Sequence, residues 1–277
     1  LLGRMTVEEK FWQLFMIPGD LEHATKDQYK NGLFGFQVSA ANRGDAGGQM
    51  LAYNTKEPAL ALGKKINRIQ RYFMDSTRLG IPVILFDEAL HGLVREGATV
   101  FPQAIGLAAS WDSTLMNKVA SAVAAETKQR GIRQILSPVV NIASDVRWGR
   151  TEETYGEDPV LSAAMGIAFV RAFESRGIIS TPKHFVANVG DGGRDSYPIH
   201  INERLLEELY FPPFKKAIQN GGSRSVMTAY NSINGTAASS NHWLLTEKLK
   251  KQWGFSGFVI SDANAVGGEL VLHNTAA

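Results

Sequence analysis

Apolar, β-branched runs alternate with longer amphipathic stretches along almost the whole chain, and this alternation limits the possible folds more than any other feature. The runs typical of strands are residues 33–38, 82–86, 135–140, 178–181, 225–229 and 258–261. The stretches with helical spacing are residues 61–79, 113–130, 160–176, 203–219 and 244–252. A further helix is predicted after Thr6, because Thr6 and Glu9 have the spacing of a capping box. Strands separated by helices predict βαβ units and a parallel sheet.

The repeated βα units favour a closed (β/α) barrel of the TIM type, a fold of about 250 residues. Composition shows no break that would mark a linker, so a single domain is predicted over residues 1–277. The alternative is a doubly wound open sheet, which fits less well because no GxGxxG fingerprint follows a predicted strand. The final stretch "ELVLHNTAA" holds no closing strand and helix, so the barrel is expected to be incomplete at its C-terminal end.

Polar side chains follow five of the predicted strands at the point where each strand ends. They are Asp87 and Glu88, Asn141, Lys183 and His184, Tyr230 and Asn231, and Asp262. One polar residue after a strand usually caps a turn or a helix, and Asp262 taken alone fits that simpler explanation. In a parallel barrel, every strand ends on the same face, where the catalytic residues of this fold gather. Five such positions in succession therefore predict a site on that face.

Composition removes several classes of function. The net charge is +2 without a basic block, and the apolar runs are short, so neither nucleic acid nor a membrane is expected as a partner. The chain has no cysteine, no HExxH spacing and no GxSxG elbow, so metal catalysis and serine hydrolysis are not expected. A carboxylate nucleophile remains, which is glycosidase chemistry. Tryptophans such as Trp148 would offer flat faces for sugar rings.

Seven segments resemble glycoside hydrolase family 3, occur in the family's order and together span nearly the whole chain. They are "MTVEEK", "LFDEALHG", "RWGRTEETYGEDP", "PKHF", "GGRDS", "SVMTAYNSINGTAASSN" and "LLTEKLKKQWGFSGFVISD". The resemblance implies a TIM-type barrel as the first domain and a retaining mechanism at the non-reducing end of β-linked sugars. It also implies an oligosaccharide or aryl β-glycoside as substrate and a periplasmic or secreted location. No cofactor is expected.

The resemblance also implies roles for individual residues. Asp262 of "ISD" matches the family nucleophile, which would attack the anomeric carbon. Asp87 matches the acid that holds hydroxyls of the terminal sugar. Donors around the same sugar are matched by Arg150, Lys183 and His184.

Four further residues take lesser roles by the same resemblance. Tyr230 matches the tyrosine beside the nucleophile, and Met227 is expected near it. Arg147 and Glu153 are expected either to brace their loop or to touch the substrate.

The acid/base is not expected within this chain. In two-domain members of the family it is a glutamate in a following α/β domain, so that domain is expected as a separate chain or as residues missing here. The loop glutamates match no acid position of the family; they are Glu88, Glu152, Glu153 and Glu157.

Two departures from the family bear on the substrate. The N-acetylglucosaminidase branch carries a motif like "KHFPGHGDT", whereas this chain reads "KHFVANVGDGGRDSYPIH". Asp191, Asp195 and His200 are present, but "PGHG" is missing and Tyr197 replaces a histidine. β-Glucosidase-like members usually carry tryptophan after the nucleophile and xylosidase-like members often cysteine, whereas this chain has Ala263.

The sequence thus predicts an exo-acting retaining β-glycosidase, with β-glucosidase first and β-xylosidase or β-N-acetylglucosaminidase as alternatives within the family. Two alternatives of other classes stay open. Lys183 at a strand end is also the feature of a TIM-barrel aldolase that works through a Schiff base. A chain without its acid/base is also compatible with a non-catalytic sugar-binding remnant.

Overall fold

The computed structural model describes residues 1–22, 24–25, 27–38, 40–42, 51–189 and 198–275. Its strands are β1 (Met16–Pro18), β2 (Gly35–Gln37), β3 (Ala40–Asn42), β4 (Leu51–Tyr53), β5 (Ile84–Asp87), β6 (Gln134–Ile135), β7 (Ser225–Met227), β8 (Ser232–Ile233), β9 (Thr236–Ala237) and β10 (Phe258–Ile260). Its α-helices are α1 (Val7–Trp12), α2 (Ala59–Ser76), α3 (Ala104–Ala108), α4 (Ser113–Gln129), α5 (Pro159–Glu174), α6 (Glu203–Leu205), α7 (Phe211–Gln219) and α8 (Ala265–Val271).

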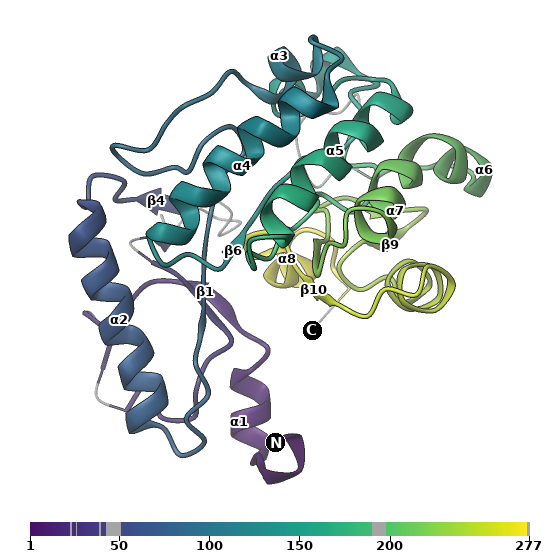
Figure 1. Ribbon diagram of the computed structural model, residues 1–277. Coiled ribbons are helices and arrows are strands. Elements are labelled where there is room, and N and C mark those ends of the chain that lie inside the picture. Colours follow the sequence, from purple (N-terminus) through teal and green to yellow (C-terminus); the bar gives the residue numbers. More distant parts are fainter. Residues whose placement is uncertain (23, 26, 39, 43–50, 190–197, 276–277) are drawn as a thin grey trace.

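The remaining helical segments are 3₁₀ turns and π-helical segments. The 3₁₀ turns are η1 (Leu2–Arg4), η2 (Val146–Trp148) and η3 (Thr151–Glu153), and the π-helical segments are η4 (Leu206–Tyr210) and η5 (Trp243–Gln252). In Figure 1, α2, α4, α5 and α7 follow one another around the outside of the strands. The strands therefore lie on the inside of the helical layer.

The main strands form parallel ladders in chain order. β1 pairs with β2, β2 with β5 and β5 with β6, while β7 pairs with β10. Single parallel bridges connect the two sets of strands; they join Gln134 to Ile179, Val139 to Lys183, and Phe185 to Thr228. Because every one of these pairings is parallel, all the strands end toward the same edge of the sheet. The predicted α/β fold with a parallel sheet is confirmed.

The sheet curls so that its two ends approach each other. Side chains from both ends meet on its inner side, in a small cluster formed by Phe86, Leu136 and Met227 with Met16 and Ile260 packed against them. Met16 is on β1 and Ile260 is on β10, the first and last strands of the ladder. Within the described residues no ladder joins β10 back to β1. Closure into a barrel therefore stays a prediction.

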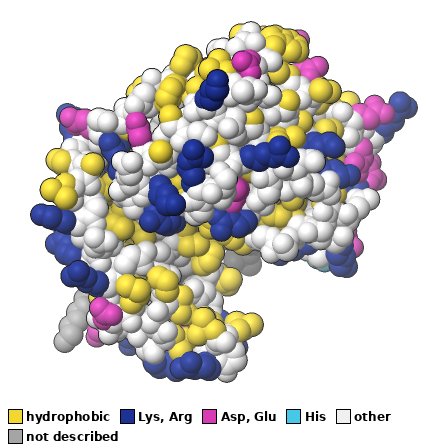
Figure 2. Space-filling view, viewed as in Figure 1, with side chains coloured by type: hydrophobic (Ala, Val, Ile, Leu, Met, Phe, Trp, Pro, Cys, Tyr) yellow, Lys and Arg dark blue, Asp and Glu magenta, His cyan; other side chains and the backbone are white. Residues whose placement is uncertain are grey.

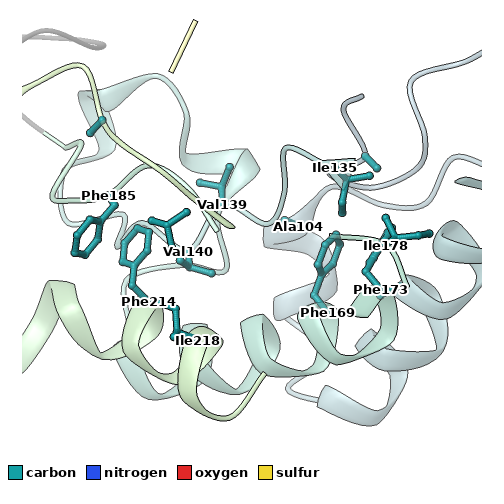
Figure 3. Packing of buried hydrophobic residues seen from close by; sticks show 14 of the residues in the cluster. Ala104, Ile135, Val139, Val140, Phe169, Phe173, Ile178, Phe185, Phe214 and Ile218 are labelled. Carbon is teal, nitrogen blue, oxygen red and sulfur yellow. The ribbon is translucent and has the colours of Figure 1, made fainter. Parts of the chain in front are cut away.

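The larger hydrophobic core lies between the sheet and the outer helices. Figure 3 shows Phe169 and Phe173 of α5 beside Ile135 and Ile178, and farther along the same layer Phe214 and Ile218 of α7 lie beside Val140 and Phe185. The rings of Phe169 and Phe173 stack with centroids 4.8 Å apart. Burying one such side chain stabilises the folded state by about 1.5–3 kcal/mol. This packing holds the strands, and hence their ends, in place.

The predicted helices begin where their capping residues are. The capping box at Thr6 is confirmed, because Thr6 Oγ1 accepts from the N–H of Glu9 and the Glu9 carboxylate accepts from the N–H of Thr6. Asp112 caps α4 by accepting from Thr114 and Leu115, and Asp158 caps α5. A cap of this kind contributes about 1 kcal/mol.

Several predicted boundaries were wrong, and prolines explain two of them. The strands predicted at 135–140 and 178–181 are reduced to β6 and single bridges. Pro138 lies in the first segment and Pro182 directly follows the second, and neither has an amide hydrogen to donate to a ladder. The helix predicted over 203–219 is divided into α6, η4 and α7, with a π-helical turn just before Pro212 and Pro213.

Some elements were not predicted at all. They are β1, the short helices α3 and α8, and the antiparallel hairpins β3–β4 and β8–β9. Each of these elements has seven residues or fewer, too few for a hydrophobic period to stand out.

The surface carries mixed charge. Figure 2 shows Lys and Arg side chains spread over the visible face, with acidic side chains gathered mainly toward one side. None of the described helices combines the length and the apolar character that a membrane crossing needs.

Candidate active site

The polar residues that follow the strands meet at one edge of the sheet. Asp87 is the last residue of β5, Lys183 pairs with Val139 of the neighbouring strand segment, and Asp262 follows β10. Two contacts join side chains from different strand ends there: Lys183 with Glu88 at 3.0 Å and His184 with Asp262 at 3.6 Å. The predicted convergence of strand-end residues is therefore observed in the structure.

The carboxylate of Asp262 lies close to an imidazole and is mostly buried. Its Oδ1 accepts a hydrogen bond from the N–H of Ala263 at 2.7 Å, which is the local bond expected of a turn residue. Its Oδ2 lies 3.6 Å from Nε2 of His184. Asp262 thus makes a turn bond with one oxygen and faces the site with the other.

His184 is held by Asn141 through backbone and side chain. The side-chain Oδ1 of Asn141 accepts from the backbone N–H of His184 at 2.7 Å and lies 3.0 Å from its ring Nδ1. The Nδ2 amide of Asn141 donates to the backbone carbonyl of His184, also at 3.0 Å. Both residues are almost fully buried. Two of these contacts fix the backbone of His184, and the third, at Nδ1, orients the imidazole.

Asp87 and Glu88 are neighbours in the sequence but have different surroundings. The Asp87 side chain is 0% exposed, and its Oδ2 accepts from Arg95 Nε at 2.6 Å. The Glu88 side chain is 22% exposed and pairs with the ammonium of Lys183 at 3.0 and 3.1 Å. In this structure the carboxylate of Asp87, predicted to hold the sugar, is enclosed, and Glu88 is the acid with an accessible surface.

Arg95 connects Asp87 to the neighbouring segments. Its guanidinium donates to the backbone carbonyls of Val38 and Asn54, at 2.6 and 3.0 Å, in addition to the Asp87 carboxylate. Burial raises the pKa of the Asp87 carboxyl to about 6, and the positive charge of Arg95 opposes that shift. Asp87 and Arg95 therefore form a buried pair that braces the edge of the sheet beneath Glu88.

The arginine-rich loop presents one buried and one exposed pair. Arg150 donates from Nε and Nη2 to the two carboxylate oxygens of Glu153, both at 2.8 Å, and its side chain is largely buried. Arg147 is 64% exposed and pairs with Asp145, which sits two residues before it. Glu153 therefore braces Arg150 within the loop. Bracing the loop was one of the two roles predicted for it, and contact with the substrate was the other.

Trp148 is not an exposed platform. It was predicted to offer its face to a sugar, but it is 1% exposed and belongs to the large hydrophobic core. The indole fills space under the loop that carries Arg150. A tryptophan ring is largely apolar, so it can either pack in a hydrophobic core or stack on a ligand. Its position in a sequence motif does not reveal which of the two it does.

Met227, the last residue of β7, and Tyr230, three residues after it, support the site. The Tyr230 hydroxyl donates to the backbone carbonyl of Ala263 at 2.7 Å, next to Asp262. A phenol has a single hydrogen, so this bond, and not one to a carboxylate, takes it. Met227 is 3% exposed and packs against Phe86 and Leu136 on the inner side of the sheet.

Three residues that carry the site's geometry had no assigned role in the sequence prediction. Glu88 and Asn141 were noted as strand-end polar residues, and Glu88 was rejected only as an acid. Arg95 lies on no predicted element and gave no signal. Tyr53 of β4 is a further neighbour: its hydroxyl accepts from Gln37 at 2.9 Å. Burial raises the pKa of Tyr53, and the nearby Glu88 carboxylate acts in the same direction.

The residues discussed for the N-acetylglucosaminidase branch cannot be placed together. Asp191, Asp195 and Tyr197 lie outside the described residues, as does the segment "GGRDS". His200 is described and exposed to solvent. Across the described residues, no group of three or more His, Asp or Glu side chains has an arrangement that could hold a metal ion.

Comparison with known proteins defines the class. The model of the glycosyl hydrolase family 3 N-terminal domain matches residues 6–277. A periplasmic β-glucosidase of Salmonella typhimurium is 33% identical and aligns with 100% of this chain and 34% of its own length. A β-xylosidase of Formosa agariphila is 37% identical over 77% of this chain and 32% of its own length.

A solved structure gives the same result. The β-glucosidase of Erythrobacter marinus superposes with a TM-score of 0.86 at 30% identity, over 99% of this chain and 37% of that protein. The chain belongs to glycosyl hydrolase family 3, in which it matches the N-terminal domain. It spans about a third of the length of these relatives.

Proposed function

We propose that the protein is an exo-acting retaining β-glycosidase that removes non-reducing terminal sugars, with a β-glucoside as the first candidate substrate. The observation that carries this proposal is the approach of His184 Nε2 to within 3.6 Å of Asp262 Oδ2 at the shared edge of the parallel strands. Family membership and relatives named β-glucosidase support it. A relative named β-xylosidase makes β-xylosides the second candidate.

The nucleophile in this proposal is Asp262. Its Oδ2 would attack the anomeric carbon, form a covalent glycosyl–enzyme ester and release the aglycone oxygen, which takes a proton from a carboxylic acid about 5–5.5 Å away. The same group, now a carboxylate, would then remove a proton from water, and the water oxygen would displace Asp262. No residue of this chain is assigned that acid/base role.

Neighbouring positive and donor groups would keep Asp262 ionised. A hydrogen bond from the N–H of Ala263 favours the carboxylate form, and a protonated His184 would favour it by Coulomb attraction. Tyr230 holds the Ala263 carbonyl and thus limits movement of the backbone that carries Asp262. This pre-ordering lowers the reorganisation needed when the nucleophile attacks.

The sugar hydroxyls would be held by two charged pairs. Lys183 with Glu88, and Arg150 with Glu153, combine donors and acceptors at largely buried positions. Such pairs suit a sugar, since each hydroxyl group both donates and accepts. Because Asp87 is enclosed by Arg95, we propose that Glu88 is the acid that contacts the sugar and that Asp87 supports it.

Architecture and context follow the same proposal. We infer a (β/α) barrel, supported by the parallel pairing in chain order and by the inner cluster against which Met16 of β1 and Ile260 of β10 both pack. A periplasmic or secreted location is supported by the Salmonella relative. A further α/β domain carrying the acid/base is proposed, as the family resemblance implies.

Labelling with a 2-deoxy-2-fluoro-β-glycosyl fluoride tests the mechanism directly, because the fluorine slows breakdown of the covalent intermediate. Peptide mass spectrometry of the labelled protein should place one fluorosugar on Asp262 and none on the Asp262→Asn variant. A label on another residue would overturn the assignment of the nucleophile. Sugar binding by calorimetry without any label or turnover would instead support a non-catalytic sugar-binding protein.

A panel of aryl glycosides tests the substrate. Turnover of the aryl β-glucoside should exceed that of the β-xyloside and the β-N-acetylglucosaminide. The reverse order of glucoside and xyloside would retain the mechanism and change the substrate. Trapping of a keto substrate on Lys183 by borohydride would favour an aldolase over either glycosidase.

A further inference from the structure

The orientation of the Asn141 side chain is determined by two backbone groups of His184. A backbone N–H can only donate, so the side-chain atom of Asn141 that lies 2.7 Å from it must be the oxygen. A backbone carbonyl can only accept, so the atom that lies 3.0 Å from it must be the amide nitrogen. The two contacts agree, and they exclude a flipped amide.

This orientation determines which ring nitrogen of His184 carries a hydrogen. Nδ1 lies 3.0 Å from the same Asn141 oxygen, and two acceptors do not form a hydrogen bond with each other. Nδ1 must therefore be the donor, and the neutral ring must have its hydrogen on Nδ1. The other nitrogen, Nε2, then presents a lone pair when the ring is neutral and an N–H when it is charged.

We propose that Asn141 is a positioning residue that holds His184 in the Nδ1–H tautomer and so presents Nε2 to Asp262. Nε2 lies 3.6 Å from Asp262 Oδ2, while the opposite side of the ring is held by Asn141. When the ring is neutral, Nε2 can accept a hydrogen bond from a hydroxyl group placed between His184 and Asp262. When the ring is protonated, Nε2 carries a hydrogen and the imidazolium faces the Asp262 carboxylate as a cation. In the alternative tautomer the Nε2 hydrogen would point toward Asp262 Oδ2, which lies 3.6 Å away.

Without Asn141 the tautomer should change. Loss of the Asn141 acceptor removes the contact that favours a hydrogen on Nδ1, and a hydrogen on Nε2 would be attracted by the Asp262 carboxylate, once the 3.6 Å separation of Nε2 and Oδ2 shortens slightly. The inference concerns the ground state of the folded protein. It rests on the proposed function only where it concerns turnover.

Nitrogen-15 NMR of histidine-labelled protein tests the tautomer without reference to activity. The His184 signals are assigned by their absence in His184→Gln. In the unmodified protein at a pH where His184 is neutral, Nδ1 should resonate as a protonated ring nitrogen and Nε2 as an unprotonated one. The opposite pattern would overturn the proposal.

Three variants of buried asparagines sharpen the test. Asn141→Asp keeps an acceptor for Nδ1 and should keep the Nδ1–H tautomer, whereas Asn141→Leu should move the hydrogen to Nε2. Asn231→Leu is the matched control, because Asn231 is equally buried at the same edge and donates to Val186 and Ser232, not to His184. A wild-type pattern in Asn141→Leu would refute the role of Asn141. If that variant does not fold, the unmodified protein and Asn141→Asp still decide.

Kinetics separate this inference from the proposed function. If both hold, Asn141→Leu lowers kcat/KM by about tenfold, because the hydrogen bond that orients the His184 ring is lost. Asn231→Leu should change it less. If the tautomer switches in Asn141→Leu while kcat/KM stays unchanged, Asn141 sets the tautomer but the tautomer does not affect turnover. A protein with no glycosidase activity but the expected NMR pattern would refute the proposed function and leave the inference standing.

Discussion

His184 and Asp262 come from strand segments that are two positions apart in the sheet, yet their side chains approach to 3.6 Å between Nε2 and Oδ2. The backbone of β7 lies between them and pairs with both segments. The contact therefore depends on the curl of the sheet at its carboxyl edge, and it places an imidazole beside the proposed nucleophile.

Removal of the nucleophile should abolish turnover and leave binding. Asp262→Ala is expected to lower kcat on the order of 10⁴-fold or more, the scale on which enzymes respond to loss of a covalent nucleophile. Added azide should restore part of the rate, because a small anion can occupy the space of the carboxylate and attack the same carbon. Turnover of an aryl glycoside is the measurement. Unchanged kcat would contradict the role of Asp262.

Glu88 and Asp87 should respond differently to loss of charge. Glu88→Gln is expected to lower kcat/KM by about tenfold or more, since a hydrogen bond to a charged group is worth about 1.5–3 kcal/mol. Most of the change should appear in KM if Glu88 binds ground state and transition state alike.

The contrast with Asp87 makes that prediction specific. Asp87→Asn should lower the free energy of unfolding more than Glu88→Gln does, because it leaves the buried guanidinium of Arg95 without its partner. Denaturant titration of both variants beside their kinetics gives the comparison. A larger stability loss in Glu88→Gln would show that the two roles are reversed.

The two arginine pairs of the loop offer a test with a built-in control. Glu153→Gln should lower kcat/KM by about tenfold, because the largely buried Arg150 loses the carboxylate that orients its guanidinium. Arg147→Gln should change kcat/KM by less than about threefold, since its pair with Asp145 is exposed and such pairs contribute about 0–1 kcal/mol. Equal effects of the two substitutions would mean that the loop acts only as a surface brace.

Stability should depend on pH through Asp87. Burial raises the pKa of its carboxyl from the ordinary 3.8 to about 6, so between these values the folded protein binds more protons than the unfolded chain. The free energy of unfolding should therefore fall as pH rises from about 4 to about 6, by up to about 3 kcal/mol from this group.

The slope of stability against pH is the readout for Asp87. Denaturant titrations at several pH values should show this fall in the unmodified protein and a flatter profile in Asp87→Asn. Absolute stability is not compared, because the variant also leaves Arg95 unpaired. The same slope in both proteins would rule out Asp87 as the group that titrates.

Much of the architecture could be predicted from patterns that repeat. α2, α4 and α5 lie where apolar residues recur at helical spacing, and Asp112 caps α4 while Asp158 caps α5. β2, β7 and β10 lie inside predicted strands, and β5 overlaps one and extends a single residue past it, to Asp87. The short β1 and the two hairpins could not be predicted in this way, because elements of two or three residues carry no period.

Within the site, the identity of the strand-end residues was predicted better than their surroundings. Trp148 and Asp87 were predicted to face a sugar, and the structure encloses both. Arg95, which lies on no predicted element, pairs with Asp87 and is itself held by the carbonyls of Val38 and Asn54, and the hydrophobic core encloses Trp148. The exposure of a side chain depends on such tertiary neighbours, and no local sequence pattern contains them.

By itself, the sequence determined that the strands run parallel, that helices cover them, and that acids, His184, Lys183 and Tyr230 stand where strands end, because periodicity and order are local properties of a chain. Only the tertiary structure decided that Glu88 rather than Asp87 reaches the accessible surface, and that Asn141 sets the orientation of the imidazole beside Asp262. Those outcomes depend on burial and on pairing across the sheet, and both arise only when the chain has folded.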